Sequence, residues 1–142
     1  MRAILLLTVS LFLLVIQKSE TMAQTDNSVH SSDKLVVLWT SDDPYVAERV
    51  ALMYTHAAKT NHWFQEVTLV VWGPSAKLIA ENLKLQEKVK EMQSDGIKIE
   101  ACIVCADSYE VTDELKKLGF EVKAMGKPLT DYLKGGAKVL TF

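Results

Sequence analysis

The stretches KLVVLWT at residues 34–40 and VTLVVW at residues 67–72 decide the fold of this chain. Each is a short, nearly continuous apolar run, which is typical of a β-strand buried on both faces of a sheet. Three further strands are predicted at residues 97–102, 120–124 and 138–141. The third strand alternates at first, which indicates a place nearer an edge of the sheet.

Helical segments separate these strands. Asp43 followed by Pro44 predicts a helix start, because a carboxylate caps the first turn and proline suits the first helical position. That helix should run to about residue 60, with one apolar stripe formed by Val46, Val50, Met53 and Ala57. No hairpin signal joins two strands, so the alternation predicts a parallel sheet with helices on both faces. The other helices are expected near residues 75–81, 85–95, 105–109, 112–118 and 130–134.

The overall composition fits one globular domain. The chain has 142 residues, of which 49% are hydrophobic and 24% are charged, with a net charge of −2. This excludes intrinsic disorder, which needs low hydrophobicity and high net charge. The mild acidity argues against nucleic acid as a partner, because nucleic-acid binders carry a basic stripe. The 2 Cys are too few for a disulfide scaffold.

The chain begins with the pattern of a secretory signal peptide. Arg2 precedes an apolar run, AILLLTVSLFLLVI, at residues 3–16, and Thr21-Met22-Ala23 offers a cleavage site after Ala23. The alternative is an uncleaved membrane anchor, but the run is shorter than the ~20 apolar residues of a spanning helix. We therefore expect a signal peptide at 1–23, a disordered polar arm at 24–33 and a folded domain at 34–142. The mature protein should be periplasmic or secreted and free of the membrane.

The carboxyl ends of the predicted strands gather unusual side chains. In open parallel α/β sheets, ligands bind beyond these ends. The third strand ends with Cys102 and leads to Cys105. The candidate ligand-binding residues at this edge are Trp39, Ser41, Asp42, Trp72, Gly73, Ser75 and Met125.

The C-x-x-C pair of Cys102 and Cys105 is the strongest candidate for a chemically reactive site. It stands where a strand gives way to a helix, and the backbone N–H groups and dipole of a helix start lower the pKa of a thiol. The thiolate is the nucleophile, so this placement favours sulfur chemistry. The alternative is that both are small buried apolar residues, as free Cys often is.

Other chemistries find little support. A closed zinc site needs four ligands, and none of His30, His56 and His62 has a partner at ligand spacing, so we expect no metal. The chain has no nucleophile elbow, no phosphate-binding lysine loop and no dinucleotide-binding glycine motif. We expect no cofactor.

Three motifs resemble the DsrE/DsrF-like (DsrEFH) family over residues 34–142. They are WGPSAKL at 72–78, ACIVCA at 101–106 and MGKPLTDYLKGGAKVLTF at 125–142. The resemblance implies a three-layer α/β/α sandwich with a five-stranded parallel sheet. It also implies a homo-oligomer, a trimer or hexamer. Sulfur-relay members carry a persulfide on the cysteine that matches Cys102, and Cys105 matches the second cysteine of a C-x-x-C branch.

One position departs from the family pattern. Members usually have Gly where this chain has Glu110. A glycine there suits a left-handed backbone between two short helices, so we expect Glu110 to be strained or to shift the turn.

Three functional hypotheses follow. The first is a sulfur carrier or sulfurtransferase that holds sulfane sulfur on Cys102, with Cys105 as the resolving thiol and a sulfur donor or acceptor protein as partner. In it, the loops at residues 39–42 and 72–75 form the pocket walls. The second is a non-enzymatic periplasmic binding or assembly module with a structural Cys pair. The third is a thiol-disulfide exchanger, which the oxidising compartment would permit.

Overall fold

A computed structural model describes residues 33–142, so the predicted signal peptide and nearly all of the predicted arm lie outside the described residues. Five strands form one sheet in the order β4-β3-β2-β1-β5, and every neighbouring pair is parallel. The sheet confirms the predicted parallel α/β class. The strands are β1 Lys34–Trp39, β2 Glu66–Val71, β3 Lys98–Cys102, β4 Glu121–Lys123 and β5 Lys138–Thr141.

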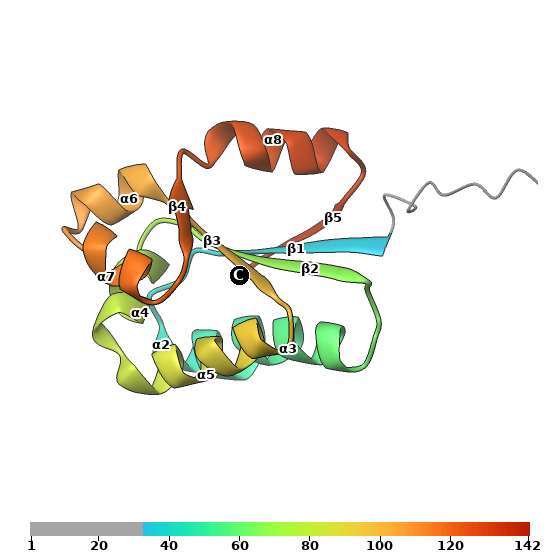
Figure 1. The fold of residues 1–142 in the computed structure, drawn as a ribbon, viewed down its shortest axis with the longest axis horizontal. Helices are drawn as coiled ribbons and strands as arrows, with labels where there is room; N and C mark the ends of the chain where they lie inside the picture. The colour runs from blue at the N-terminus through green and yellow to red at the C-terminus, as the bar shows by residue number, and fades with distance from the viewer. Residues whose placement is uncertain (1–32) are drawn as a thin grey trace, which may run out of the picture.

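Helices cover both faces of this sheet and complete a three-layer α/β/α sandwich. Figure 1 shows α3 and α5 on one face and α8 on the opposite face, with α4, α6 and α7 gathered at the end where β2, β3 and β4 finish. The helices are α2 Pro44–Val46, the π-helix η2 Ala47–Ala51, α3 Leu52–Thr60, α4 Ser75–Glu81, α5 Leu83–Ser94, α6 Ile103–Ser108, α7 Thr112–Lys117 and α8 Gly126–Lys134.

Two cores lie on the two faces of the sheet, because successive side chains of a strand point in opposite directions. Val37 and Trp39 of β1 belong to the larger core, which includes residues of α3 and α5. Val36, which precedes Val37, belongs to a smaller core under α8. This smaller core contains Cys102, so the predicted nucleophile lies beneath the α8 layer.

The first helical segment begins as predicted but presents a different face to the sheet. One carboxylate oxygen of Asp43 accepts from the backbone N–H groups of Tyr45 and Val46, at 2.7 and 3.3 Å. The predicted apolar stripe is wrong, since Val50 is 39% and Met53 is 56% exposed. The residues buried instead are Ala47, Ala51, Leu52, Thr55 and Ala58.

The physical reason for this error is side-chain size. A stripe made mainly of Ala and Thr lets the helix backbone lie close to the sheet, while the larger Val50 and Met53 remain at the flanks. The segment also contains η2, whose wider π-type turn changes the register of the residues that follow it.

One further expectation needs correction. Helix α8 begins at Gly126 rather than Thr130, because Pro128 stands in its first turn, where no intrahelical N–H is needed. Strand β3 lies next to the edge strand β4, which agrees with the predicted place nearer an edge. Within residues 33–142, no helix is long and apolar enough to cross a membrane.

Candidate functional site at the carboxyl ends of the strands

Cys102 is the last residue of β3 and the N-cap of α6. Its backbone is extended, with φ −74° and ψ 114°, so the chain turns from strand to helix at this residue. Its side chain points into the smaller core with Val36, Val70 and Met125, and the residue is only 4% exposed. An apolar enclosure of this kind keeps water and bulky thiols away from the sulfur.

Cys105 follows in the first turn of α6 and is partly exposed. It packs against both cores, which places it at the boundary between the sheet end and the surface. Both cysteines are free thiols in this structure. The sequence-predicted pair is therefore brought together, with one buried thiol and one accessible thiol.

The pKa of Cys105 is raised above that of an ordinary thiol. Burial is the largest cause, a hydrogen bond from the backbone of Gly73 acts in the lowering direction, and the neighbouring Cys102 raises the pKa further. The prediction that the helix start lowers this pKa is thus wrong for Cys105. Helix α6 has only 6 residues, so few aligned peptide dipoles act on the thiol.

The turn after β2 is held by Ser75. Its buried hydroxyl donates to the carbonyl of Trp39 at 2.6 Å and accepts from the backbone N–H of Trp72 at 3.1 Å. Gly73 adopts φ +70°, a left-handed conformation that glycine adopts at no steric cost. The Ser75 hydroxyl thus joins the ends of β1 and β2 and fixes the turn that carries the Gly73 N–H.

The two tryptophans predicted at this edge lie on opposite faces of the sheet. Trp39 is fully buried in the larger core, where its indole N–H has no hydrogen-bond partner among the described residues. Trp72 is partly buried and packs against the smaller core under α8. The two indoles therefore do not line one common wall beside the cysteines.

The other predicted residues divide between the loop after β1 and the smaller core. The Ser41 hydroxyl accepts from the backbone N–H of Asp43 at 3.1 Å, which forms a local turn just before α2. Met125 is 1% exposed and lies in the smaller core with Cys102. Asp42 is exposed at a hollow of about 380 Å³ that Pro74, Lys77, Leu78, Glu81 and Tyr109 also line. Neither cysteine lines this hollow, although Tyr109, which does, follows Cys105 by one helical turn.

Sequence reasoning missed Glu100, which is fully buried two residues before Cys102 on β3. Its Oε1 accepts from Lys98 at 2.6 Å, from Lys123 at 2.9 Å and from the Tyr132 hydroxyl at 3.0 Å, while Oε2 is buried without a partner among the described residues. Burial acts to raise the pKa of Glu100, but these three donors outweigh it and the pKa is lowered. The alternation of polar and apolar residues in IKIEAC is the one sequence signal that could have found it, because residues two positions apart on a strand, such as Glu100 and Cys102, lie on the same side.

Glu110 confirms the expected left-handed backbone, with φ +58°. It joins α6 to α7, and the next residue, Val111, donates its N–H to the carbonyl of Ala106 at 2.9 Å. The turn is kept although a side chain stands where glycine would be unstrained.

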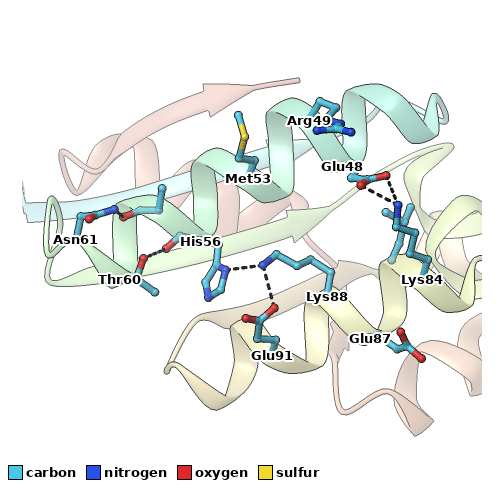
Figure 2. A pocket seen from close by; sticks show the side chains of 12 residues that line it. Glu48, Arg49, Met53, His56, Thr60, Asn61, Lys84, Glu87, Lys88 and Glu91 are labelled. Atoms are coloured by element: carbon cyan, nitrogen blue, oxygen red, sulfur yellow. Dashed lines mark hydrogen bonds and ion pairs between the residues drawn. The ribbon is translucent and has the colours of Figure 1, made fainter.

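A second hollow, of about 600 Å³, lies between the η2–α3 segment and α5. Figure 2 shows that its charged residues pair across the groove, with Lys84 on Glu48 at 2.8 Å. Lys88 reaches both Glu91 and the Nδ1 of His56, at 2.9 and 2.8 Å. Neither cysteine lines this hollow. Within residues 33–142, no three His, Cys, Asp or Glu side chains gather as metal ligands would.

The sequence model of the DsrE/DsrF-like family matches residues 33–142. The chain belongs to this family. A solved structure of a conserved protein of unknown function from Bacteroides thetaiotaomicron is 37% identical to it, with a TM-score of 0.78; the match covers 82% of this chain and 100% of that one. The ychN protein of E. coli is 18% identical with a TM-score of 0.62, over 78% of this chain and 99% of its own, and shows the fold alone. No curated protein matches this chain.

Membership in the DsrE/DsrF-like family suggests a role of the sulfur-relay type. The relative from Bacteroides is described as being of unknown function, so it lends no activity to this chain.

Proposed function

We propose that this chain is a sulfur carrier of the DsrE/DsrF-like family that holds sulfane sulfur as a persulfide on Cys102, with Cys105 as the resolving thiol. The observation that carries the proposal is the position of two neighbouring free thiols at the carboxyl end of β3, one enclosed and one accessible. That edge is where ligands of parallel α/β sheets bind.

The chemistry needs only the two thiols and a sulfur donor. A thiolate of the pair attacks the outer sulfur of thiosulfate, the sulfur–sulfur bond breaks, and sulfite leaves with the bonding electrons. The added sulfur is then held as a persulfide on Cys102, and the apolar wall of Val36, Val70 and Met125 shields it from water. Cys105 can resolve this persulfide by attacking the Cys102 sulfur, which closes a disulfide and releases hydrosulfide.

The partners and the compartment are part of the same proposal. We propose a homo-oligomer, a trimer or hexamer, and a donor or acceptor protein that meets the cysteine edge. An exposed apolar side chain next to the cysteines supports a protein contact there, since Val104 is 69% exposed. The apolar run at residues 3–16 supports export and cleavage after Ala23, which would place the carrier in the periplasm or outside the cell.

Mass spectrometry tests the carrier role. The reduced protein is incubated with thiosulfate or polysulfide, freed of donor and weighed intact. We expect one added sulfur atom, about 32 Da, which peptide fragmentation locates on Cys102. A wild-type protein that gains no sulfur, or a Cys102→Ala/Cys105→Ala double variant that gains as much, would overturn the proposal.

The 4% exposure of Cys102 favours a second candidate, a binding or assembly module in which the Cys pair is structural. Thiol accessibility separates the two candidates. If neither cysteine of the folded, reduced protein reacts with a thiol reagent, the binding module is supported and the carrier is excluded.

A further inference from the structure

The two thiols of the site differ in what can reach them. Cys102 is 4% exposed and lies in the smaller core with Val36, Val70 and Met125, whereas Cys105 is partly exposed. An attacking sulfur must come within about 3–3.5 Å of the atom it attacks, with its orbital aligned along the breaking bond. A donor outside the protein meets this condition at Cys105 and not at Cys102.

The surroundings of Cys105 also suit a receiving thiol. The backbone of Gly73 hydrogen-bonds to its sulfur, so a fixed dipole faces the position where negative charge develops. The Ser75 hydroxyl donates a 2.6 Å hydrogen bond to the carbonyl at the end of β1, which keeps the Gly73 turn in place beside Cys105. The hollow of about 380 Å³ at Pro74 and Tyr109 gives a small donor room next to α6.

From this difference in access we infer that sulfur is received by Cys105 and passed inward to Cys102, so that Cys105 is the first nucleophile and Cys102 the storage site. This rests on the proposed carrier function and adds an order of events to it. The exposed thiol of Cys105 reacts with the sulfur donor, and the enclosed position of Cys102 keeps the bound sulfur from reacting with other thiols.

Each step balances without an oxidant or reductant beyond the donor. The Cys105 thiolate attacks the outer sulfur of thiosulfate, and sulfite leaves with the electrons of the broken sulfur–sulfur bond. The Cys102 thiolate then attacks the outer sulfur of the Cys105 persulfide. A new sulfur–sulfur bond forms on Cys102, and Cys105 leaves as a thiolate that takes up the proton lost by Cys102.

The acidity of Cys105 bears on both steps of the transfer. Burial raises its pKa, and the neighbouring Cys102 raises it further, so Cys105 retains a proton more readily than an ordinary thiol. The raised pKa slows the first attack at neutral pH, because the thiolate is the nucleophile, and it favours the second step, in which the proton comes to Cys105.

Single-cysteine variants test the order. Wild type, Cys105→Ala and Cys102→Ala are each reduced, mixed with thiosulfate, sampled over time, alkylated and weighed, and thermal unfolding checks that each variant folds. Met53→Ala is the matched control, since this exposed residue lines the hollow that neither cysteine lines and should load as the wild type does. We expect Cys102→Ala to gain one sulfur on Cys105, and Cys105→Ala to load at least tenfold more slowly than wild type.

The outcomes separate the order from the carrier function. If Cys105→Ala loads Cys102 at the wild-type rate, the order is overturned while the carrier function stands. If the wild type itself gains no sulfur, the carrier function fails first. A measurement on the wild-type protein does not depend on the folding of any variant. Iodoacetamide should label Cys105 at least tenfold faster than Cys102. Equal or reversed rates would contradict the inference.

Discussion

The hydroxyl of Ser75 donates a 2.6 Å hydrogen bond to the main-chain carbonyl of Trp39, joining residues 36 positions apart in the sequence. The same oxygen accepts from the Trp72 N–H at 3.1 Å. The ends of β1 and β2, and the turn that faces Cys105, are thus tied by a single side chain. Stability and thiol reactivity should both depend on it.

Replacing Ser75 by Ala should lower the free energy of unfolding by about 1 kcal/mol. The loss is moderate because the Trp39 carbonyl also accepts from the Trp72 N–H at 3.0 Å and so keeps one partner. Urea denaturation measures the change. Ser94→Ala, an exposed serine at the end of α5, serves as the control and should change little; equal effects of the two variants would argue against the role of Ser75.

Glu110→Gly should stabilise the protein by roughly 0.5–1 kcal/mol. The φ of +58° costs a residue with a Cβ about 1–2 kcal/mol, and glycine removes this cost. Part of the gain is offset, because glycine also increases the conformational entropy of the unfolded chain. Thermal unfolding should show a higher Tm. Glu110→Ala removes the same charge but keeps the Cβ, so an equal rise in that variant would show that charge and not backbone strain is responsible.

The free energy of unfolding should fall as the pH drops from about 5 towards 2. The pKa of Glu121 is lowered to about 2 by hydrogen bonds from Lys123 and Lys98, and that of Glu100 is lowered by donors that outweigh its burial. A carboxyl whose folded pKa lies below its unfolded value of about 4.3 stabilises the fold above that pH. This stabilisation is lost as the pH falls through the folded pKa, which denaturation at several pH values can follow.

Tyr132→Phe tests the part of Glu100 in this pH dependence. The variant lacks the hydroxyl that donates to Glu100 at 3.0 Å, so it should be less stable at pH 7 by about 1.5–3 kcal/mol, the range for a bond to a charged group. The deficit should narrow as the pH falls through the lowered folded pKa of Glu100, where the wild-type carboxylate also loses its charge. A deficit that stays constant with pH would contradict this explanation. Tyr45→Phe, at a residue 76% exposed, should show no deficit at any pH.

Alkylation of Cys105 should accelerate with pH over an unusually wide range. Because burial raises its pKa above the ordinary thiol value, the thiolate fraction of Cys105 should keep growing at pH values where that of an ordinary thiol levels off. Site-resolved iodoacetamide labelling measures this rate, with glutathione as the reference thiol. A rate that has levelled off by pH 8 would mean that the thiol is more acidic than its surroundings predict.

The elements that could be predicted from sequence are those set by local patterns. The apolar runs of β1 and β2 and the Asp43-Pro44 helix start need no distant partner, and the structure has them where they were expected. The predicted stripe with Val50 and Met53 was wrong because the prediction chose the larger apolar side chains. Close packing of the helix against the sheet instead buries small residues, mainly Ala and Thr.

The parts of the site that escaped prediction depend on contacts distant in sequence. Besides the nearby Lys98, Glu100 accepts from Lys123 and Tyr132, which are 23 and 32 positions away, so the local sequence shows only part of what makes its burial possible. The enclosure of Cys102 arises from Val36, Val70 and Met125 on three other segments. A C-x-x-C spacing identifies the pair, but only the fold distinguishes the buried thiol from the accessible one.

The most direct test of the central claim is the amount of sulfane sulfur that one chain can carry. Reduced wild-type protein is loaded with thiosulfate, freed of donor and treated with cyanide, which removes sulfane sulfur as thiocyanate that can be measured by colour. We predict close to one thiocyanate per chain and none from the Cys102→Ala/Cys105→Ala double variant. No thiocyanate from a folded wild-type protein whose thiols are reduced would contradict the proposal that this chain carries sulfur.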